Sequence, residues 1–359
     1  MTLRIIQVGL GGWGQSWAVN IVAANKDVET VAWVEIDEET LQQARQRLIA
    51  QNQAEDGLTT EESGHDQSLS LGEDHFFTSL EEALSATEAE AVLITASLPG
   101  HVPATRMALQ AGKHVLLEKP FAPTSAEALE LVELAERQGR ILMVSQNYRF
   151  IPAVRAAAQV VRDQVLGDIG TVSIDFRRFD HTAPFETHRH YKIWEPLLAD
   201  MAIHHFDLMR LVLGQEPVQV FCKTWNTAWS KYVEPPAGTM TITFDGGAVV
   251  NYRGSWISMG PPTDWAGEWH MEGEHGELVW TGRGELPDAA ILRLSGEEPR
   301  ALKLPRLKAV DRAGSLDAFV QAVQNGTTPE TSGRDNLKTL AFMFAAIESA
   351  RTGLPVDIG

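Results

Sequence analysis

The start of the chain joins a short apolar segment to a glycine-rich turn, and this feature constrains the fold more than any other. Residues 3–8 are mostly apolar and are followed at once by a Gly-x-Gly-x-x-Gly pattern. In a strand–turn–helix unit, Gly9 permits the tight turn, Gly11 lets the backbone approach a pyrophosphate, and Gly14 lets the helix pack on the strand. An acidic residue, Glu35, ends the next apolar run. The pattern predicts a dinucleotide-binding unit with the phosphates at the helix N-terminus, the alternative being a flexible glycine loop.

Length, charge and cysteine content narrow the class of protein. The 359 residues are enough for two domains, and the formal net charge of −18 disfavours nucleic acid and anionic membranes as partners. The single cysteine, Cys222, excludes an intramolecular disulfide, which suits a cytoplasmic location. No run approaches the roughly 18 apolar residues of a membrane span. The apolar run at 3–8 contains Arg4 and enters the glycine turn directly, so we interpret it as a strand and not as a signal peptide.

Alternating apolar patterns divide the chain into two expected domains. Residues 1–147 alternate strands and helices, which predicts a doubly wound parallel sheet of the α/β class. Residues 148–334 contain alternating strands separated by turns, which predicts an α+β domain whose mainly antiparallel sheet has helices on one face. Residues 51–74 are polar and acidic and are expected to form a surface insertion. A final helix within 335–359 carries too much apolar surface for a free tail.

One candidate site follows the fourth core strand of the predicted parallel sheet. Glu118, Lys119 and Pro120 come directly after the apolar run at 114–117, at the carboxyl end of the strand. Ligands of open α/β sheets bind at this end. Lys119 is therefore a candidate catalytic residue, although a surface ion pair with Glu118 or simple solvation would also account for it.

A second candidate site lies on the helix expected over 197–213. Asp200 and His204 are four residues apart and would share one face, where an imidazole can accept a proton and a carboxylate can orient it. His205 would point to another side and is assigned a structural role. A surface ion pair on the helix is one alternative. Metal binding is another, but the Asp200–His204 pair offers two ligands and the sequence identifies no third, so no metal is expected. The histidines close in sequence are His181, His188, His190, His204 and His205.

These features, in this order, resemble the Gfo/Idh/MocA family, which is named for glucose-fructose oxidoreductase, inositol dehydrogenase and a rhizopine catabolism protein. The segments that carry the resemblance are 111–120, 147–152, 200–207 and 348–353. The resemblance implies a Rossmann domain followed by a domain with a large open sheet, and a final helix that returns to the first domain. It also implies a homodimer or homotetramer formed through the open face of the sheet. Lys119, Asp200 and His204 fall on the family's catalytic lysine, aspartate and histidine.

The cofactor expected from the glycine turn and the resemblance is NAD in preference to NADP. Glu35 can accept hydrogen bonds from both ribose hydroxyls, whereas a 2′-phosphate would meet like charge and find no cation at Ile36. This chain has Ala96, Ser97 and Leu98 where the family usually has Thr-Pro-Asn, so asparagine contacts are lost and backbone contacts remain. The residues expected to contact the cofactor are Gly9, Gly11, Gly12, Trp13, Gly14, Glu35, Thr95, Ala96, Ser97, Leu98, His101, Glu118, Lys119, Asn147 and Arg149.

The leading hypothesis is an NAD-dependent dehydrogenase that acts on a secondary hydroxyl of a sugar, cyclitol or sugar derivative. His204 would remove the hydroxyl proton, Lys119 would stabilise the negative charge that develops on the oxygen, and Asp200 would position the substrate. Tyr191 and Trp194 could form an aromatic wall for the sugar, or simply pack in the core. Two other hypotheses are an NAD-dependent glycosidase of the same fold, which oxidises its substrate transiently, and a non-catalytic NAD-binding regulator. A regulator would not need Lys119, Asp200 and His204 together.

Overall fold

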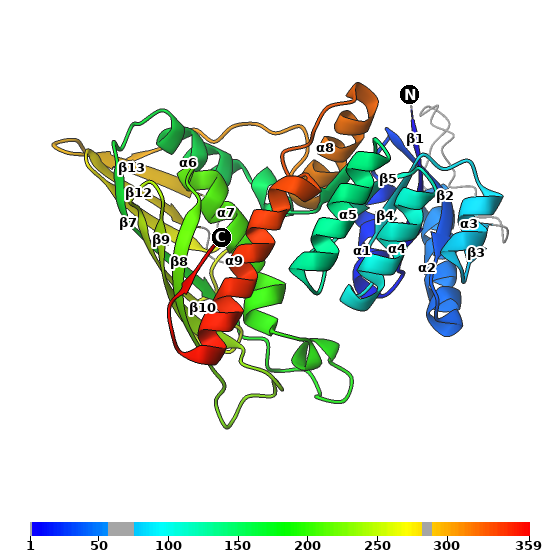
Figure 1. The fold of residues 1–359 in the computed structure, drawn as a ribbon, viewed down its shortest axis with the longest axis horizontal. Helices are drawn as coiled ribbons and strands as arrows, with labels where there is room; N and C mark the ends of the chain where they lie inside the picture. Colours follow the sequence, from blue (N-terminus) through cyan, green and yellow to red (C-terminus); the bar gives the residue numbers. More distant parts are fainter. Residues whose placement is uncertain (1, 57–74, 282–288) are drawn as a thin grey trace. The chain divides into compact units, whose positions relative to one another are not determined.

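The chain forms two compact units in a computed structural model that describes residues 2–56, 75–281 and 289–359 (Figure 1). The first unit contains Met1–Ser145 and Arg312–Leu337, and the second contains Gln146–Asp311 and Lys338–Gly359. The first boundary therefore lies two residues before the expected one. Most of the acidic insertion expected at 51–74 lies outside the described residues, although helix α2 continues as far as Asp56.

The first unit contains a parallel sheet in the described part of the chain, with strand order β3-β2-β1-β4-β5-β6. This order reverses direction between β1 and β4, where doubly wound folds bind their ligands. The predicted α/β class is confirmed. The strands are β1 (Leu3–Val8), β2 (Val28–Val34), β3 (Phe76–Phe77), β4 (Ala91–Ile94), β5 (His114–Leu117) and β6 (Leu142–Val144). The helices are α1 (Gly12–Trp17) with the π-helix η1 (Ala18–Val22), α2 (Glu38–Asp56), α3 (Leu80–Ala86), α4 (Leu98–Gln110), α5 (Ser125–Arg137) and α8 (Asp311–Asn325).

Local sequence signals explain why these elements begin where they do. The hydroxyl of Thr124 accepts a hydrogen bond from the Glu127 N–H and donates to the Glu127 carboxylate, a capping arrangement at the start of α5. Ser79 caps α3 in a similar way by accepting from the Glu82 N–H. Strand β4 is buried at every position, as expected for a parallel strand that has helices on both faces.

The second unit contains a larger sheet, with strand order β14-β13-β12-β11-β7-β10-β9-β8-β15 in its described residues. Its pairings are antiparallel except that between β7 and β10, which confirms a mainly antiparallel sheet. The strands are β7 (Ile169–Arg177), β8 (Pro217–Trp225), β9 (Ala237–Phe244), β10 (Val249–Ser255), β11 (Glu268–Gly273), β12 (Gly276–Thr281), β13 (Ala289–Leu294), β14 (Arg300–Ala301) and β15 (Val356–Asp357). The helical segments are η3 (Asn147–Phe150), α6 (Pro152–Arg162), η4 (Arg189–Lys192), η5 (Pro196–Ala202), α7 (Ile203–Leu213) and α9 (Gly333–Thr352).

One face of this sheet is covered by helices and the other is open. Along β8, Val220 and Cys222 are buried, whereas Phe221 between them is 44% exposed. This alternation is expected of a strand with one covered and one open face. Helices α6, α7 and α9 lie along the covered face (Figure 1).

The final helix differs from the expectation that residues 335–359 pack on the first domain. Only Gly333–Leu337 belong to the first unit, and Lys338–Gly359 belong to the second. The physical reason is the apolar face of α9, where the Phe342 ring stacks on Phe206 of α7 with 4.2 Å between the ring centroids. Beyond α9, β15 also pairs with β8. Residues 338–359 therefore group with the second unit by their contacts, and the segment that groups with the first unit is Arg312–Leu337.

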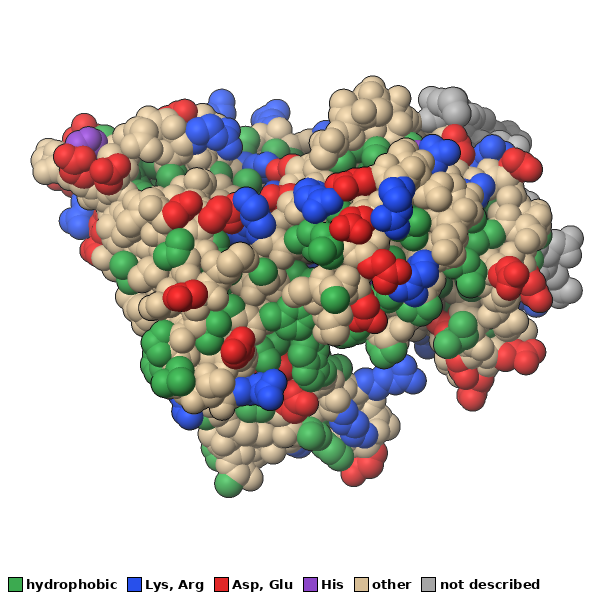
Figure 2. Space-filling view, in the orientation of Figure 1, with side chains coloured by type: hydrophobic (Ala, Val, Ile, Leu, Met, Phe, Trp, Pro, Cys, Tyr) green, Lys and Arg blue, Asp and Glu red, His purple; other side chains and the backbone are tan. Residues whose placement is uncertain are grey.

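The described surface shows how the net charge is distributed. Figure 2 shows acidic and basic side chains interspersed over the visible face, so the net charge of −18 is not gathered there into one patch. Among the described residues, no helix is both long enough and apolar enough to cross a membrane.

Candidate functional site

The glycine turn between β1 and α1 leaves open space at two of its glycines and none at two others. Gly9 has a φ of +92°, and a Cβ there would lie 2.4 Å from the Ala96 nitrogen. A Cβ at Gly14 would lie 1.9 Å from the Gly9 carbonyl oxygen, whereas one at Gly11 or Gly12 would meet no atom within 4 Å. The turn is thus closed where the backbone packs and open beside the first N–H groups of α1. This arrangement fits a pyrophosphate.

Buried polar side chains hold the turn in place. The Thr95 hydroxyl donates to the Gly9 carbonyl oxygen at 2.8 Å, and the Gln7 amide donates to the Gly14 carbonyl oxygen at 2.7 Å. The Leu10 N–H donates to the Glu35 carboxylate at 2.8 Å, which fixes this acid at the end of β2. Thr95 therefore supports the turn, while Glu35 remains partly exposed, as contact with a ribose requires.

Lys119 follows β5 on a segment anchored by its neighbour. The Glu118 side chain is 4% exposed and accepts hydrogen bonds from the Trp17 indole at 2.8 Å and from the Lys119 N–H at 3.2 Å. Burial raises the pKa of Glu118. Because its carboxyl group accepts from both donors, Glu118 links the backbone of Lys119 to Trp17 of helix α1. Trp13 on the same helix is half exposed and lies 4.3 Å under the guanidinium of Arg312.

His101 connects the two loops that end β4 and β5. Its Nε2 lies 2.9 Å from the Ala96 carbonyl oxygen and its Nδ1 lies 2.8 Å from the Pro120 carbonyl oxygen. The ring is only 2% exposed, and burial lowers the pKa of His101. Both ring nitrogens are thus directed at backbone oxygens, so the ring joins the two loops. Ser97 and Leu98, at the start of α4, remain as the expected contacts on this side.

In the second unit, His204 lies in the first turn of α7 with its ring fixed from two sides. Its Nδ1 lies 3.2 Å from the Gln146 amide oxygen, and its ring stacks on Tyr148 with 4.3 Å between the centroids. The side chain is buried, with 6% of the residue exposed. Because an amide oxygen can only accept, this contact favours the tautomer that carries the proton on Nδ1, in which Nε2 is the basic nitrogen.

Asp200 lies in a π-helical turn instead of the α-helix expected over 197–213. The segment is π-helical over Pro196–Ala202 and becomes α-helical at Ile203. Short π-helical turns occur frequently at functional sites. The Asp200 Oδ2 accepts a hydrogen bond from His190 Nε2 at 3.2 Å.

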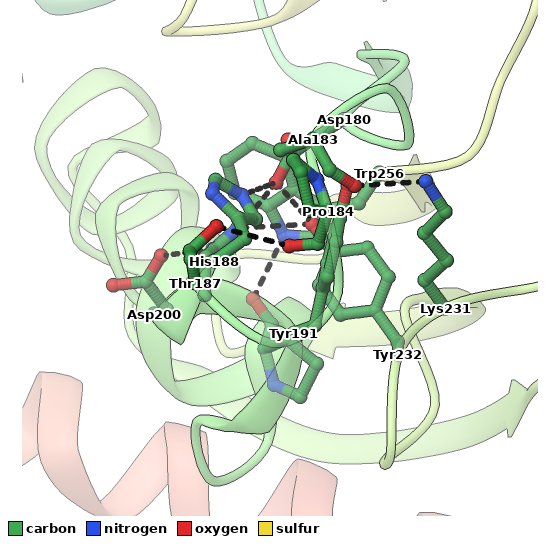
Figure 3. Close-up of polar contacts among 12 residues, drawn as sticks. Asp180, Ala183, Pro184, Thr187, His188, Tyr191, Asp200, Lys231, Tyr232 and Trp256 are labelled. Carbon is green, nitrogen blue, oxygen red and sulfur yellow. Dashed lines mark hydrogen bonds and ion pairs between the residues drawn. The ribbon is translucent and has the colours of Figure 1, made fainter.

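His190, which contacts Asp200, belongs to a compact polar cluster that also contains Asp180, His188 and Tyr232 (Figure 3). Asp180 Oδ2 lies 2.7 Å from His190 Nδ1, 3.0 Å from His188 Nε2 and 2.7 Å from the Tyr232 hydroxyl. Burial alone would lower the pKa of His190, but the carboxylates of Asp200 and Asp180 on either side of the ring outweigh it and raise this pKa. Sequence reasoning missed Asp180 and Tyr232. The histidine-rich run that starts at His181 was the one available signal, and nothing near it indicates Tyr232.

Two residues expected at the cofactor are committed to contacts inside the second unit. Arg149 forms a two-point ion pair with Asp207, at 2.6 and 2.7 Å, and the two residues are 5% and 1% exposed. The Asn147 amide donates to the carboxylate of Asp311. Both side chains therefore have structural partners that account for their burial.

The two residues considered for an aromatic wall lie in different surroundings. Tyr191 has no exposed surface and packs between His188 and Tyr232, with ring centroids 4.3 and 5.1 Å away, so it is a core residue. Trp194 is 38% exposed and lines a separate open hollow of about 650 Å³. The other lining residues are Glu195, Phe344, Ile347, Glu348, Arg351 and Thr352, which include neither Asp200 nor His204.

The three residues expected to be catalytic are thus divided between the units. Lys119 belongs to the first unit, and Asp200 and His204 belong to the second. Within the second unit, Asp200 and His204 come from consecutive turns of one helical segment, η5 followed by α7.

Comparison with known proteins gives relatives over the whole chain. An uncharacterized protein, y4oX, of Sinorhizobium fredii is 28% identical over 372 residues, covering 100% of this chain and 96% of that protein. The D-apiose dehydrogenase of Paraburkholderia graminis is 29% identical over 289 residues, covering 77% of this chain and 74% of that enzyme. The crystal structure of aldose-aldose oxidoreductase from Caulobacter crescentus, complexed with glycerol, has a TM-score of 0.80 at 22% identity, covering 99% of this chain and 100% of that one.

Two family descriptions match the two parts of the sequence. Residues 3–146 match the Gfo/Idh/MocA oxidoreductase family with an NAD-binding Rossmann fold, and residues 154–279 match the C-terminal domain of the same family. These ranges contain the glycine turn, Lys119, Asp200 and His204. The chain therefore belongs to the Gfo/Idh/MocA family of oxidoreductases.

Proposed function

We propose that this protein is an NAD-dependent dehydrogenase that oxidises a secondary hydroxyl of a sugar, cyclitol or sugar derivative to a ketone. The observation that carries the proposal is the orientation of His204. Gln146 holds the ring through Nδ1, and in the tautomer with the proton on Nδ1 the nitrogen that can accept a proton is Nε2. In a family whose first domain binds NAD, a fixed base of this kind suits removal of a hydroxyl proton.

Each of three side chains has a distinct role in this reaction. When bound, NAD supplies the acceptor for the hydride that leaves the carbinol carbon. His204 takes the hydroxyl proton at Nε2, so the hydride and the proton leave the same carbinol group and a carbonyl forms. The Lys119 ammonium stabilises the negative charge that develops on the oxygen. Asp200 accepts a hydrogen bond from a second hydroxyl and so orients the ring of the substrate.

The preference for NAD over NADP rests on the carboxylate at the end of β2. Glu35 is held beside the glycine turn by the Leu10 N–H, where its oxygens can accept from the ribose hydroxyls. Its neighbour Ile36 is 84% exposed and offers no positive charge to a 2′-phosphate. Fluorescence titration of the purified protein should therefore give a lower Kd for NADH than for NADPH, and an equal or lower Kd for NADPH would contradict this assignment.

The substrate class is supported by the names of two similar proteins. One is a D-apiose dehydrogenase and the other an aldose-aldose oxidoreductase, so both act on sugars. The test is a panel of aldoses, cyclitols and sugar acids with NAD, in which NADH and the oxidised product are both measured. The proposal predicts equal amounts of the two. Glycoside cleavage without net NADH formation would instead indicate the glycosidase alternative.

The open face of the larger sheet suggests how copies of the chain associate. Phe221 and Trp225 on β8 are 44% and 40% exposed, so this strand presents aromatic side chains to solvent. We infer a homodimer or homotetramer that buries this face. Light scattering should show an oligomer in the native protein and a smaller species in the variant Phe221→Glu.

A further inference from the structure

Three side chains of the polar cluster place atoms that could bind a metal ion around one point. Asp180 follows β7, whereas His188 directly precedes η4 and His190 lies within it. Asp180 Oδ2 is 3.0 Å from His188 Nε2 and 2.7 Å from His190 Nδ1, and all three atoms lie within 4.8 Å of one another. Ligands held at about 2.0–2.2 Å from a tetrahedral ion are themselves roughly 3.3 Å apart. The cluster therefore needs only small shifts to bind an ion.

The second nitrogen of His190 faces a carboxylate. Its Nε2 lies 3.2 Å from Asp200 Oδ2, so a His190 that binds an ion through Nδ1 would donate its remaining N–H to Asp200. Histidines that bind metals usually donate their other N–H to a carboxylate or carbonyl oxygen, which fixes the tautomer and the ring. This contact does not involve the three potential ligand atoms, and it supplies the carboxylate partner that a metal-binding histidine usually has.

Neighbouring aromatic side chains restrict the orientation of the two histidine rings. The Trp256 ring meets the His190 ring edge-on, with 4.5 Å between the centroids, and the Tyr191 ring lies 4.3 Å from that of His188. The Tyr232 hydroxyl lies 2.7 Å from Asp180 Oδ2 and 2.9 Å from His190 Nδ1, close to the point where the donors converge. Figure 3 shows Asp180, His188 and Tyr232 directed toward one another from separate segments of the chain.

The other group of potential ligands in the described residues is built differently. His270 and Glu272 on β11 lie beside Glu277 on β12, but the side chains of His270 and Glu272 are 42% and 59% exposed. The guanidinium of Arg293 lies 2.6 Å from the Glu277 carboxylate and already balances its charge. This second group is therefore a natural control.

We propose that Asp180, His188 and His190 bind one divalent metal ion, with Asp200 as the carboxylate that orients His190. Two imidazoles and one carboxylate suit Zn²⁺ and similar first-row ions. Three protein ligands leave a coordination position open, which a hydroxyl or carboxylate oxygen of a substrate can occupy. Binding of the ion does not depend on the proposed function, but its use in holding a substrate oxygen beside Asp200 rests on that function.

The test is a titration of the full-length, chelator-treated protein with Co²⁺, followed by visible absorption and elemental analysis. We expect one Co²⁺ per chain and the visible bands of a tetrahedral site. His188→Ala and His190→Ala should each weaken binding at least tenfold, and Asp200→Asn should weaken it about 10- to 100-fold. His270→Ala is the matched control and should bind Co²⁺ as the unmodified protein does.

A measurement on the unmodified protein keeps the test valid if a variant does not fold. In a protein labelled with ¹⁵N at histidine, Zn²⁺ should shift the ring signals of two histidines and leave that of His270 unchanged. If the cluster is only a chain of ion pairs, no Co²⁺ bands appear, and His190 carries protons on both nitrogens. That result, or bands that persist in the double variant His188→Ala/His190→Ala, would overturn the proposal.

The outcomes also separate this proposal from the proposed function. Cobalt binding is measured without NAD or sugar, so metal binding without sugar oxidation would refute only the dehydrogenase assignment. Full NADH formation by a protein that binds no Co²⁺ would refute only the metal site.

Discussion

Acidification should destabilise the second unit through one buried histidine. His205 has no exposed surface, its Nε2–H donates to the Trp265 carbonyl oxygen at 2.9 Å, and its Nδ1 accepts from the Tyr252 hydroxyl at 2.9 Å. Burial raises the pKa of Tyr252 well above its ordinary value, so this phenol remains a donor. Burial also lowers the pKa of His205 from 6.5 to about 4, which means that the folded protein holds the ring neutral.

The magnitude follows from the difference between the folded and unfolded pKa values. Because the folded pKa of His205 is depressed, its contribution to stability is fully present above pH 6.5 and is lost as the pH falls toward 4. At about 1.36 kcal/mol per pH unit, the total loss is about 3 kcal/mol. Between pH 7.5 and pH 5 the same relation gives a loss of about 2 kcal/mol in the free energy of unfolding.

Urea unfolding at several pH values, followed by tryptophan fluorescence, measures this loss. His205→Gln cannot titrate, so its free energy of unfolding should be lower than that of the unmodified protein at neutral pH and should depend less on pH. The difference between the two should shrink by about 2 kcal/mol from pH 7.5 to pH 5. His275→Gln, at an exposed site, is the control and should keep the original slope. Equal slopes for His205→Gln and the unmodified protein would show that His205 does not cause the loss of stability in acid.

Three further predictions concern the cofactor turn and the core. Glu35→Ser should weaken NADH binding about tenfold, because two charge-assisted hydrogen bonds to the ribose are lost. Titration with both cofactors should show a smaller ratio of the Kd for NADPH to the Kd for NADH, and an unchanged ratio would count against the role of Glu35. Gly11→Ala should weaken NADH binding but leave the melting temperature unchanged, since the new Cβ meets no protein atom within 4 Å. Gly14→Ala should lower the melting temperature, because its Cβ would lie 1.9 Å from the Gly9 carbonyl oxygen. A lower melting temperature for Gly11→Ala than for Gly14→Ala would contradict the packing of the glycine turn. Asp207→Asn should reduce the free energy of unfolding by about 3–5 kcal/mol, because Arg149 would keep a buried charge without its carboxylate; a loss below about 1 kcal/mol would contradict this.

Much of the fold could be predicted because the strands β1, β4, β5 and β6 of the first unit are almost entirely buried. Such strands read as short apolar runs, and the run at 114–117 matches β5 residue for residue. The helix cap formed by Ser79 could also be predicted, since capping depends on residues that are close in sequence. The π-helical turn at 196–202 was not, because a change from α- to π-helical hydrogen bonding leaves the apolar pattern nearly unaltered. The grouping of residues 338–359 with the second unit was also not predictable, since an apolar helix face does not identify the surface on which it packs.

The candidate site was predicted where its residues belong to short motifs and missed where tertiary contacts decide. Lys119 and His204 were proposed as site residues from their positions after a strand and on a helix. The pairing of Arg149 with Asp207 joins residues 58 positions apart, and the contact between Asp180 and Tyr232 spans 52 positions. No local pattern encodes such contacts, because they depend on how separate segments fold together.

In the proposed reaction, Lys119 stabilises the charge that develops on the oxygen of a sugar hydroxyl during oxidation by NAD. The most direct measurement compares kcat for the best sugar in the panel, together with the Kd for NADH, between the unmodified protein and Lys119→Ala. Lys113→Ala serves as a control, because it removes a lysine just before β5. We expect Lys119→Ala to lower kcat by about 100-fold or more and to leave the Kd for NADH nearly unchanged. A Lys119→Ala variant that keeps near-full turnover would contradict it.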